Sequence, residues 1–357
     1  MGNVTICSLA GHSALEIFAG AKASGFKTVA LVVEGRDQTY IKYYKNLCDN
    51  FIYLKSFQDL TTPSTVKLIS DKYKHIIFIP HRYIQVYCDL NKFERDFKVP
   101  VFGNRNLLKY EEREGASNQY LILKKAQIAY PMQFKTPGQI DRLVIVKVRE
   151  KARNYERSFF FAENYSDFKR QSEKLIKIGK INKRDLTKAV IEEYLVGVQV
   201  NFNFFYSPMK KRLELLGIDT RRQTNIDGLI RLPVNEQAAY LKHTKPSYIE
   251  SGHIAVTVKE SLLEPAFLFA EKLITAAKKK VKPGIIGPFA LQTVIIPGPP
   301  KEKIVVFDLS FRIPGSPGTA YTPYSSYLFG RNISFGERIA LEIKNALKSK
   351  SLKNILT

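Results

Sequence analysis

The chain has 357 residues, enough for two or three domains. Of these residues 45% are hydrophobic and 25% are charged, and no stretch approaches the ~20 apolar residues of a membrane helix, so we expect no membrane segment. Lys and Arg (56) outnumber Asp and Glu (33), which gives a formal net charge of +23. This excess favours anionic partners, namely nucleic acid, nucleotides or phosphorylated metabolites, although a lysine-rich solvated surface explains it equally well.

The three cysteines, Cys7, Cys48 and Cys88, lie far apart, with no CxxC pattern and no nearby histidine pair. This spacing argues against a disulfide framework or a zinc site and favours a reducing, cytoplasmic location. The N-terminus, MGNVTICSLAG, lacks the basic region of a signal peptide.

Residues 1–105 alternate between short apolar strands and helices, which predicts βαβ units and a parallel sheet. The strands are expected at residues 4–10, 27–33, 50–54, 75–80 and 99–103, with a helix over 12–25 that Ser13 caps. Ligands of such sheets bind beyond the carboxyl ends of the strands. His12 and the segment His81–Tyr83 follow two of these strands, so we expect both at the binding edge. The alternative for His12 is a residue of the helix cap without a ligand.

The rest of the chain is mostly antiparallel in pattern. Helices are expected at 107–128, 164–180, 261–281 and 335–348, and strands at 144–147, 159–162, 198–206, 212–218 and 228–233. The charged loop between the strands that begin at 144 and 159 contains no glycine and follows Lys147. It is either a phosphate-covering loop without glycines or an ordinary solvated hairpin.

Residues 287–313 predict a hairpin around PGPPKEK. If its turn centres near residue 300, Gln292 lies opposite Asp308. Strand alternation then divides the second strand into an apolar face and a polar face. The apolar face is Val305, Phe307, Leu309, Phe311 and Ile313, and the polar face is Asp308, Ser310 and Arg312. Gln292 and Asp308 together offer two oxygens to Mg²⁺; the alternative is a strand with one solvated face.

A second polar cluster, GIDTRRQTNIDGLIRLP, offers Arg221, Arg222 and Arg231 as phosphate contacts, with a solvated turn as the alternative.

Several longer stretches resemble the archaeal formate-dependent purine-biosynthesis ligases, the PurP family. They include GHSALEIFAGAKASGF, VFGNRNLLKYE, IEEYLVGVQVNFNFFYSPMKKRLELLGIDTRRQTNIDGLIRLP, PSYIESGHIAVTVKESLLEP, KPGIIGPFALQ and FDLSFRI. The resemblance runs almost end to end. It implies an α/β protein with a Rossmann-like domain at 1–105 and an ATP-grasp domain at 106–357, whose two lobes cover about 130–195 and 196–357.

The resemblance also implies a reaction. This is the ATP- and formate-dependent formylation of 5-aminoimidazole-4-carboxamide ribonucleotide in purine biosynthesis, through formyl phosphate. ATP would be the co-substrate and Mg²⁺ or Mn²⁺ the cofactor. A cytoplasmic homo-oligomer is expected, and nucleic acid is not an expected partner.

Position by position, the resemblance makes His12 a substrate-binding residue. It places Tyr83 where the family has a serine for the substrate phosphate, and His253 where it has a substrate-binding asparagine. Gln292 and Asp308 match the metal positions, with Asp308 replacing a glutamate.

For ATP, Lys147 matches the lysine before the phosphate loop, and Glu193, Tyr194 and Val196 lie in the segment that lines the adenine pocket. Gln223 replaces an ATP-site glutamate. The family's glycine-rich loop is replaced at 149–157 by bulky residues, of which Arg153 and Arg157 would supply charge. Ala320 replaces an asparagine that the family carries after Gly318 and Thr319.

These substitutions keep a second hypothesis open, a diverged member with lost or altered ligase activity that binds a nucleotide as a regulatory or assembly subunit. A third, nucleic-acid binding, rests on charge alone and predicts binding that falls steeply with salt.

Overall fold

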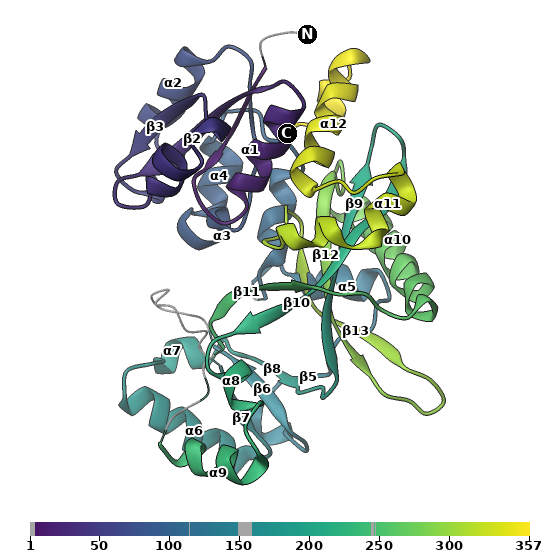
Figure 1. Cartoon of the computed structure of the whole chain (residues 1–357). Coiled ribbons are helices and arrows are strands. Elements are labelled where there is room, and N and C mark those ends of the chain that lie inside the picture. The colour runs from purple at the N-terminus through teal and green to yellow at the C-terminus, as the bar shows by residue number, and fades with distance from the viewer. Residues whose placement is uncertain (1–3, 114, 149–158, 244–245, 247) are drawn as a thin grey trace.

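The computed structural model describes residues 4–113, 115–148, 159–243, 246 and 248–357, which form three sheets (Figure 1). The N-terminal sheet is parallel, in the order β3-β2-β1-β4. Its strands are β1 (Thr5–Leu9), β2 (Lys27–Val33), β3 (Asn50–Leu54) and β4 (Ile76–Phe78). The expected parallel sheet is therefore confirmed, although the strand expected at 99–103 is reduced to bridges of Val101 with Phe78 and of Phe102 with Leu356.

β1 and β2 are buried on both sides because helices cover both faces of this sheet. They are α1 (Ala14–Ala23), α2 (Pro63–Lys72), α3 (Tyr83–Tyr87) and α4 (Leu90–Asp96). Ile6 packs with residues of α1, whereas Cys7 packs with residues of α2, α3 and α4.

The second sheet, β5-β8-β6-β7, is antiparallel and forms the lower lobe in Figure 1. Its elements are β5 (Gln133–Phe134), β6 (Val144–Lys147), β7 (Phe159–Ala162), β8 (Val190–Glu193), α6 (Tyr165–Lys177) and α7 (Lys183–Leu186). Val144, Val146 and Phe160 pack against Phe168 of α6 in a small separate core.

The third sheet, β11-β10-β9-β12-β13, is antiparallel and carries the largest core. Its strands are β9 (Val198–Ser207), β10 (Arg212–Gln223), β11 (Glu250–Ala255), β12 (Gly287–Ile296) and β13 (Lys303–Ser310). Helix α10 (Leu263–Lys280) packs on one face, and α12 (Phe335–Lys348) packs on the other between this sheet and α1.

The remaining elements are short. They are α5 (Gln119–Lys125), α8 (Ile226–Leu229), α9 (Val234–His243), α11 (Pro323–Phe329), the π-helix η1 (Thr39–Tyr43) and the 3-10 helices η2 (Lys45–Leu47), η3 (Phe57–Thr61), η4 (Arg105–Glu111), η5 (Pro137–Gln139), η6 (Glu260–Leu262), η7 (Pro317–Tyr321) and η8 (Leu352–Asn354).

Helix α12 is fixed to both of its neighbours. Toward the sheet, Arg338 Nε lies 2.6 Å from Glu214 Oε2 of β10, and its Nη1 lies 2.9 Å from Glu342 Oε2, all three side chains being buried. Toward α1, Gly336 lies so close that a Cβ atom on it would be 1.9 Å from the carbonyl oxygen of Glu16. The Rossmann-like sheet and the large sheet are thereby joined through α12.

Three expectations about local structure are wrong. The helix expected at 107–128 is interrupted, because Gly115 adopts a positive φ and Asn118 begins α5 as its N-cap. Residues 228–233 are not a strand, since α8 and the turn after it occupy them. Ser13 precedes α1 but does not cap it, because its hydroxyl donates to the carbonyl oxygen of Pro314, 2.7 Å away.

The polar and apolar faces of β13 also differ from the simple alternation. The pairing with β12 shifts by one residue at Phe307, a bulge that reverses which side chains face the core. Ile304 and Val306 face the core before the bulge, and Leu309 and Phe311 after it. The expectation that Val305 and Phe307 share one face with Leu309 and Phe311 is therefore wrong, whereas the polar row that begins at Asp308 is kept.

No helix in the part of the chain that the structure describes is long and apolar enough to cross a membrane.

Candidate active site

The hairpin of β12 and β13 brings Gln292 directly opposite Asp308, as the sequence predicts. Both side chains are largely buried, which holds their oxygens in place. Arg113 Nη2 lies 2.8 Å from Asp308 Oδ2, and Arg221 donates to Gln292 Oε1. The charge of Asp308 raises the pKa of Arg113, so the guanidinium stays protonated.

This pair fits a partial magnesium site. Mg²⁺ usually takes one or two protein carboxylates and completes its shell with waters and substrate phosphates. Among the described residues, no group of three His, Cys, Asp or Glu side chains is placed to hold a metal by itself. One carboxylate and one amide oxygen therefore suit a cation that arrives with a polyphosphate.

Lys147 ends β6 and extends toward the same region. Its Nζ lies 2.7 Å from Glu192 Oε2, and Tyr120 donates its hydroxyl to the other oxygen of Glu192. Burial lowers the pKa of Lys147, with the charge of Glu192 opposing this, and the charges of Arg113 and Asp308 also act on it. The lysine thus lies within electrostatic reach of the Gln292–Asp308 pair.

The predicted adenine segment follows β8 and leads into β9. The Glu193 carboxylate is held inside its lobe, since Oε1 accepts from the backbone N–H of Met132 at 2.8 Å. The Tyr194 ring packs edge-on against Phe161, at 4.9 Å between centroids, and Val196 is 74% exposed. The Glu193 carboxylate is already hydrogen-bonded and Val196 is exposed, so a flat ligand can reach this segment from solvent.

Gln223 lies at the far end of β10, apart from the metal pair. Its backbone N–H donates to Asp227 Oδ2 at 2.5 Å, and Arg222 Nε lies 3.2 Å from the same oxygen. Arg153 and Arg157 fall outside the described residues.

His12 follows β1 with φ of 49°, and its ring is stacked on that of His81 at 5.6 Å between centroids. Its Nδ1 lies 2.5 Å from Ser13 Oγ. Because the only hydroxyl proton of Ser13 goes to the carbonyl oxygen of Pro314, Ser13 Oγ accepts from His12 Nδ1–H. The neutral ring therefore carries its proton on Nδ1 and presents a lone pair on Nε2.

The surroundings of His12 keep this ring neutral. Crowding by protein around the ring, followed by the positive charges of Arg312 and Arg82, lowers the pKa of His12 well below its usual value, even though part of the side chain remains accessible. His81 itself is buried, and its Nε2–H donates to the carbonyl oxygen of Leu9 at 2.8 Å.

Tyr83 occupies the space beside the turn after β1. A Cβ atom on Gly11 would lie 2.1 Å from its ring, so Gly11 is required for this approach. The guanidinium of Arg36 donates to the Tyr83 hydroxyl at 2.8 Å and lies over the ring, 5.3 Å from its centroid.

His253 is held between two carboxylates. Its Nδ1 lies 2.5 Å from Asp219 Oδ2 and its Nε2 lies 2.8 Å from Glu250 Oε1. Burial alone would lower its pKa, but the hydrogen bonds to Asp219 and Glu250 raise the pKa of His253 to about 9. Both ring nitrogens are thus engaged, and Glu250 Oε2 in turn lies 3.0 Å from Arg221 Nε.

Sequence reasoning missed Arg113, Glu192 and Asp219 as parts of this site. Asp219 carried the clearest signal, a carboxylate directly after the apolar run at residues 215–218. Arg113 and Glu192 gave none beyond their charge, because their partners lie 195 and 45 positions away along the chain.

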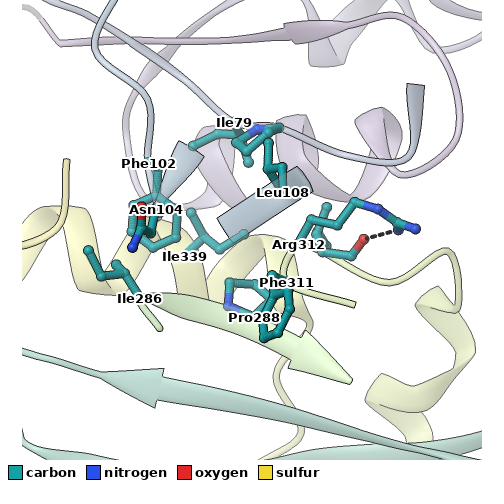
Figure 2. A pocket seen from close by; sticks show the side chains of 12 residues that line it. Ile79, Phe102, Asn104, Leu108, Ile286, Pro288, Phe311, Arg312 and Ile339 are labelled. Atoms are coloured by element: carbon teal, nitrogen blue, oxygen red, sulfur yellow. Dashed lines mark hydrogen bonds between the residues drawn. The ribbon is translucent and has the colours of Figure 1, made fainter. Parts of the chain in front are cut away.

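Arg312 connects the two halves of the site. It lies just beyond β13 on the side of Asp308, and its side chain turns away from a small cavity beneath the N-terminal sheet (Figure 2). That cavity, of about 10 Å³, is lined mainly by apolar residues such as Ile79, Phe102 and Ile339, and is at the lower limit for one water molecule. It is a packing gap and not a substrate site.

Comparison with solved structures defines the class of protein. The chain matches the crystal structure of an IMP biosynthesis protein PurP from Thermococcus kodakaraensis with a TM-score of 0.73 and 24% identity, over 99% of this chain and 100% of that one. It matches N5-carboxyaminoimidazole synthetase from Staphylococcus aureus, complexed with ADP, with a TM-score of 0.59 and 16% identity, over 96% and 77%. The protein has the ATP-grasp fold.

Sequence comparison defines the family. Residues 6–134 match a protein family of unknown function (DUF1246), and residues 167–357 match a domain of unknown function (DUF1297). The chain is 37% identical to 5-formaminoimidazole-4-carboxamide-1-(beta)-D-ribofuranosyl 5'-monophosphate synthetase of Methanocaldococcus jannaschii and 35% identical to that of Methanopyrus kandleri, over 99% of this chain and 95% of each relative. The chain belongs to this family of synthetases, the PurP family.

Proposed function

We propose that this protein is an ATP-dependent ligase that formylates 5-aminoimidazole-4-carboxamide ribonucleotide with formate. One observation supports the proposal: Gln292 lies opposite Asp308 on the β12–β13 hairpin, with Arg113 Nη2 2.8 Å from Asp308 Oδ2. The charge of Asp308 acts on both Lys147 and Arg312, and the charge of Arg312 acts on His12. A polyphosphate fits at the Lys147 end, and an amine to be deprotonated fits at the His12 end.

In the first step, a formate oxygen attacks the γ-phosphorus of ATP. A P–O bond forms, the bond to the bridging oxygen breaks, and ADP leaves with formyl phosphate as the other product. Lys147, beside Glu192, and Arg113, beside Asp308, would neutralise the oxygens of the transferring group. Gln292 and Asp308 would hold Mg²⁺ or Mn²⁺, which supplies further charge neutralisation when it is bound.

In the second step, the substrate amine attacks the formyl carbon, the C–O bond to phosphate breaks, and phosphate leaves. The attacking nitrogen must lose one proton. His12 Nε2 is the base that the hydrogen bonds around it leave unprotonated, and its lowered pKa keeps it so at neutral pH.

The test is product formation from purified protein with ATP, Mg²⁺, formate and the aminoimidazole carboxamide ribonucleotide, with detection by mass. We expect formylated product in many-fold excess over enzyme, dependent on both ATP and formate. The absence of product from folded protein would contradict the proposal.

A diverged member that binds nucleotide without this reaction is the second candidate. Two observations favour it: the Tyr83 ring fills the space against Gly11, and both nitrogens of His253 are engaged with carboxylates. It predicts ATP binding by calorimetry with no formylated product. For either function we propose a homo-oligomer, which light scattering on the purified protein would test.

A further inference from the structure

The polar row after the bulge of β13 includes the Ser310 hydroxyl, which no hydrogen bond within the described residues uses. Ser310 is 3% exposed, and its hydroxyl has no hydrogen-bond partner among the described residues. Gln85 of α3 is 5% exposed, and its Nε2 likewise has no partner in the described chain. Buried polar atoms are normally hydrogen-bonded, because leaving them unpaired is costly. Two such donors at one site point to a ligand that accepts from them.

Arg312 shows where that ligand would lie. Its Nε donates to Gln85 Oε1 at 3.2 Å and lies 3.2 Å from Glu111 Oε2, and its Nη1 lies 3.4 Å from the carbonyl oxygen of Ile313. Within the described residues, Nη2 makes no hydrogen bond. Gln85 and Glu111, which belong to other segments, thus hold the guanidinium in place. Its Nη2 keeps its N–H groups available for a ligand.

One of the three donor atoms is Nη2 of Arg312 itself, and the other two belong to residues connected to Arg312. Gln85 bonds to Arg312 directly, and Ser310 lies two residues before it, on the same side as Asp308. Burial, opposed by the charge of Glu111, lowers the pKa of Arg312 to about 10, so it remains a cation at neutral pH. A cation with neutral donors beside it matches a small carboxylate, which accepts on two oxygens.

We propose that Arg312 Nη2, Ser310 Oγ and Gln85 Nε2 form the subsite for the carboxylate co-substrate. This inference rests on the proposed function, in which the carboxylate is formate. The subsite lies in the polar row that begins with Asp308 of the metal pair, and the charge of Arg312 also acts on His12. A formate held there has the γ-phosphate on one side and the amine on the other, as the two steps require.

The kinetic test uses Ser310→Ala, which removes one donor and little volume. We expect the KM for formate to rise about tenfold, the effect of one hydrogen bond to a charged group, while the KM values for ATP and the ribonucleotide change less than twofold. Gln85→Leu should act in the same direction. An unchanged KM for formate in both variants overturns the proposal.

Two controls separate binding from folding. Ser172→Ala removes a buried hydroxyl of α6, in the other lobe, and should leave the KM for formate unchanged. The melting temperature of Ser310→Ala should equal or exceed that of the wild type, because its hydroxyl has no partner to lose. A rise in the KM for formate without loss of stability is not expected from a structural residue.

A binding measurement separates this inference from the proposed function. Carbon-13 formate is titrated against protein saturated with ADP and Mg²⁺, where no turnover occurs. Line broadening by the wild type that Ser310→Ala weakens supports the subsite, even if no formylated product forms and the proposed function fails. Equal broadening by both proteins, or none by the wild type, overturns the subsite. Phosphate binding that weakens in Ser310→Ala while formate binding does not would reassign the subsite to the phosphoryl group and also overturn it.

Discussion

Asp308 is the residue on which the nucleotide end of the site depends. It is the carboxylate of the proposed metal pair, with Gln292 opposite and Arg113 at 2.8 Å. We expect Asp308→Ala to abolish Mg²⁺-dependent ATP binding, because it removes a metal ligand and leaves Arg113 without its counter-ion. Calorimetry of ATP binding with and without Mg²⁺ measures this.

Asp141→Ala is the matched control for that variant, since it removes an exposed surface carboxylate whose ion pair within the described residues is with Arg142. It should bind ATP as the wild type does. Nucleotide affinity that is unchanged in Asp308→Ala would show that the metal assignment is wrong.

In the proposed reaction, His12 is the base at the amine end. Its lowered pKa predicts that kcat/KM for the ribonucleotide stays level as pH falls from 8 to 6.5 and declines only at lower pH, where the base becomes protonated. His12→Gln should lower kcat by roughly 10²- to 10⁴-fold. The measurement is the pH profile of the wild type beside the rate of the variant; a profile that already falls between pH 8 and 7 would contradict the assignment.

In the proposed reaction, Ser13 would act through His12. Because Ser13 Oγ accepts from Nδ1–H while donating to the carbonyl oxygen of Pro314, it fixes the tautomer that exposes the Nε2 lone pair. A residue that resembles a helix cap in the sequence is therefore a positioning residue in the structure.

At the scale of elements, the crossing of α1 and α12 decides how the N-terminal sheet meets the large one. Gly336→Ala would place its Cβ 1.9 Å from the carbonyl oxygen of Glu16, so the helices must separate. We expect a loss of at least about 1–3 kcal/mol in the free energy of unfolding, the usual cost of overpacking. Urea denaturation measures it.

Gly138→Ala is the control for this crossing, because a Cβ atom there meets nothing within 4 Å. Its stability should match or slightly exceed that of the wild type. Equal stability of the two variants would mean that α1 and α12 can move apart without cost.

The bulge in β13 is the second decisive feature at this scale. Gln119 bridges it, since Oε1 accepts from Leu309 N–H at 2.8 Å and Nε2 donates to the carbonyl oxygen of Phe307 at 3.4 Å. Glu111 Oε1 accepts from Phe311 N–H at 2.7 Å in the same way. These side chains satisfy the free edge of β13 and so hold the polar row from Asp308 to Arg312 in register.

For the molecule as a whole, buried histidine makes stability depend on pH. Burial lowers the pKa of His81 to about 4, so the folded protein keeps it neutral while the unfolded chain binds a proton near pH 6.5. Its contribution is present above pH 6.5 and is lost as pH falls toward 4. We expect the stability advantage of the wild type over His81→Gln to shrink by up to about 3 kcal/mol over this window.

Urea denaturation of both proteins at several pH values between 7 and 4 tests this. Glu16, whose pKa burial raises to about 7, contributes in the opposite direction but is common to both proteins and cancels in the difference. Parallel stability curves for the two proteins would contradict the role of His81.

The sequence predicted much of this architecture because the features concerned are local. Alternating apolar residues and the PGPPKEK turn set the pairing of Gln292 with Asp308, and the apolar strand before His12 placed it at the edge of the parallel sheet. The long run of matching motifs implied the family and the ATP-grasp fold, and the comparisons confirm both.

What only the tertiary structure decided is where each polar side chain finds its partner. Arg113 meets Asp308 and Ser13 meets Pro314 across most of the chain, and the bulge at Phe307 reverses one stretch of β13. Ser310 is left buried without a hydrogen-bond partner among the described residues. Backbone periodicity is a property of neighbouring residues, so the sequence carries it directly. Burial and hydrogen bonding depend on which distant segments pack together, and these determine a tautomer, a lowered pKa or an unused donor.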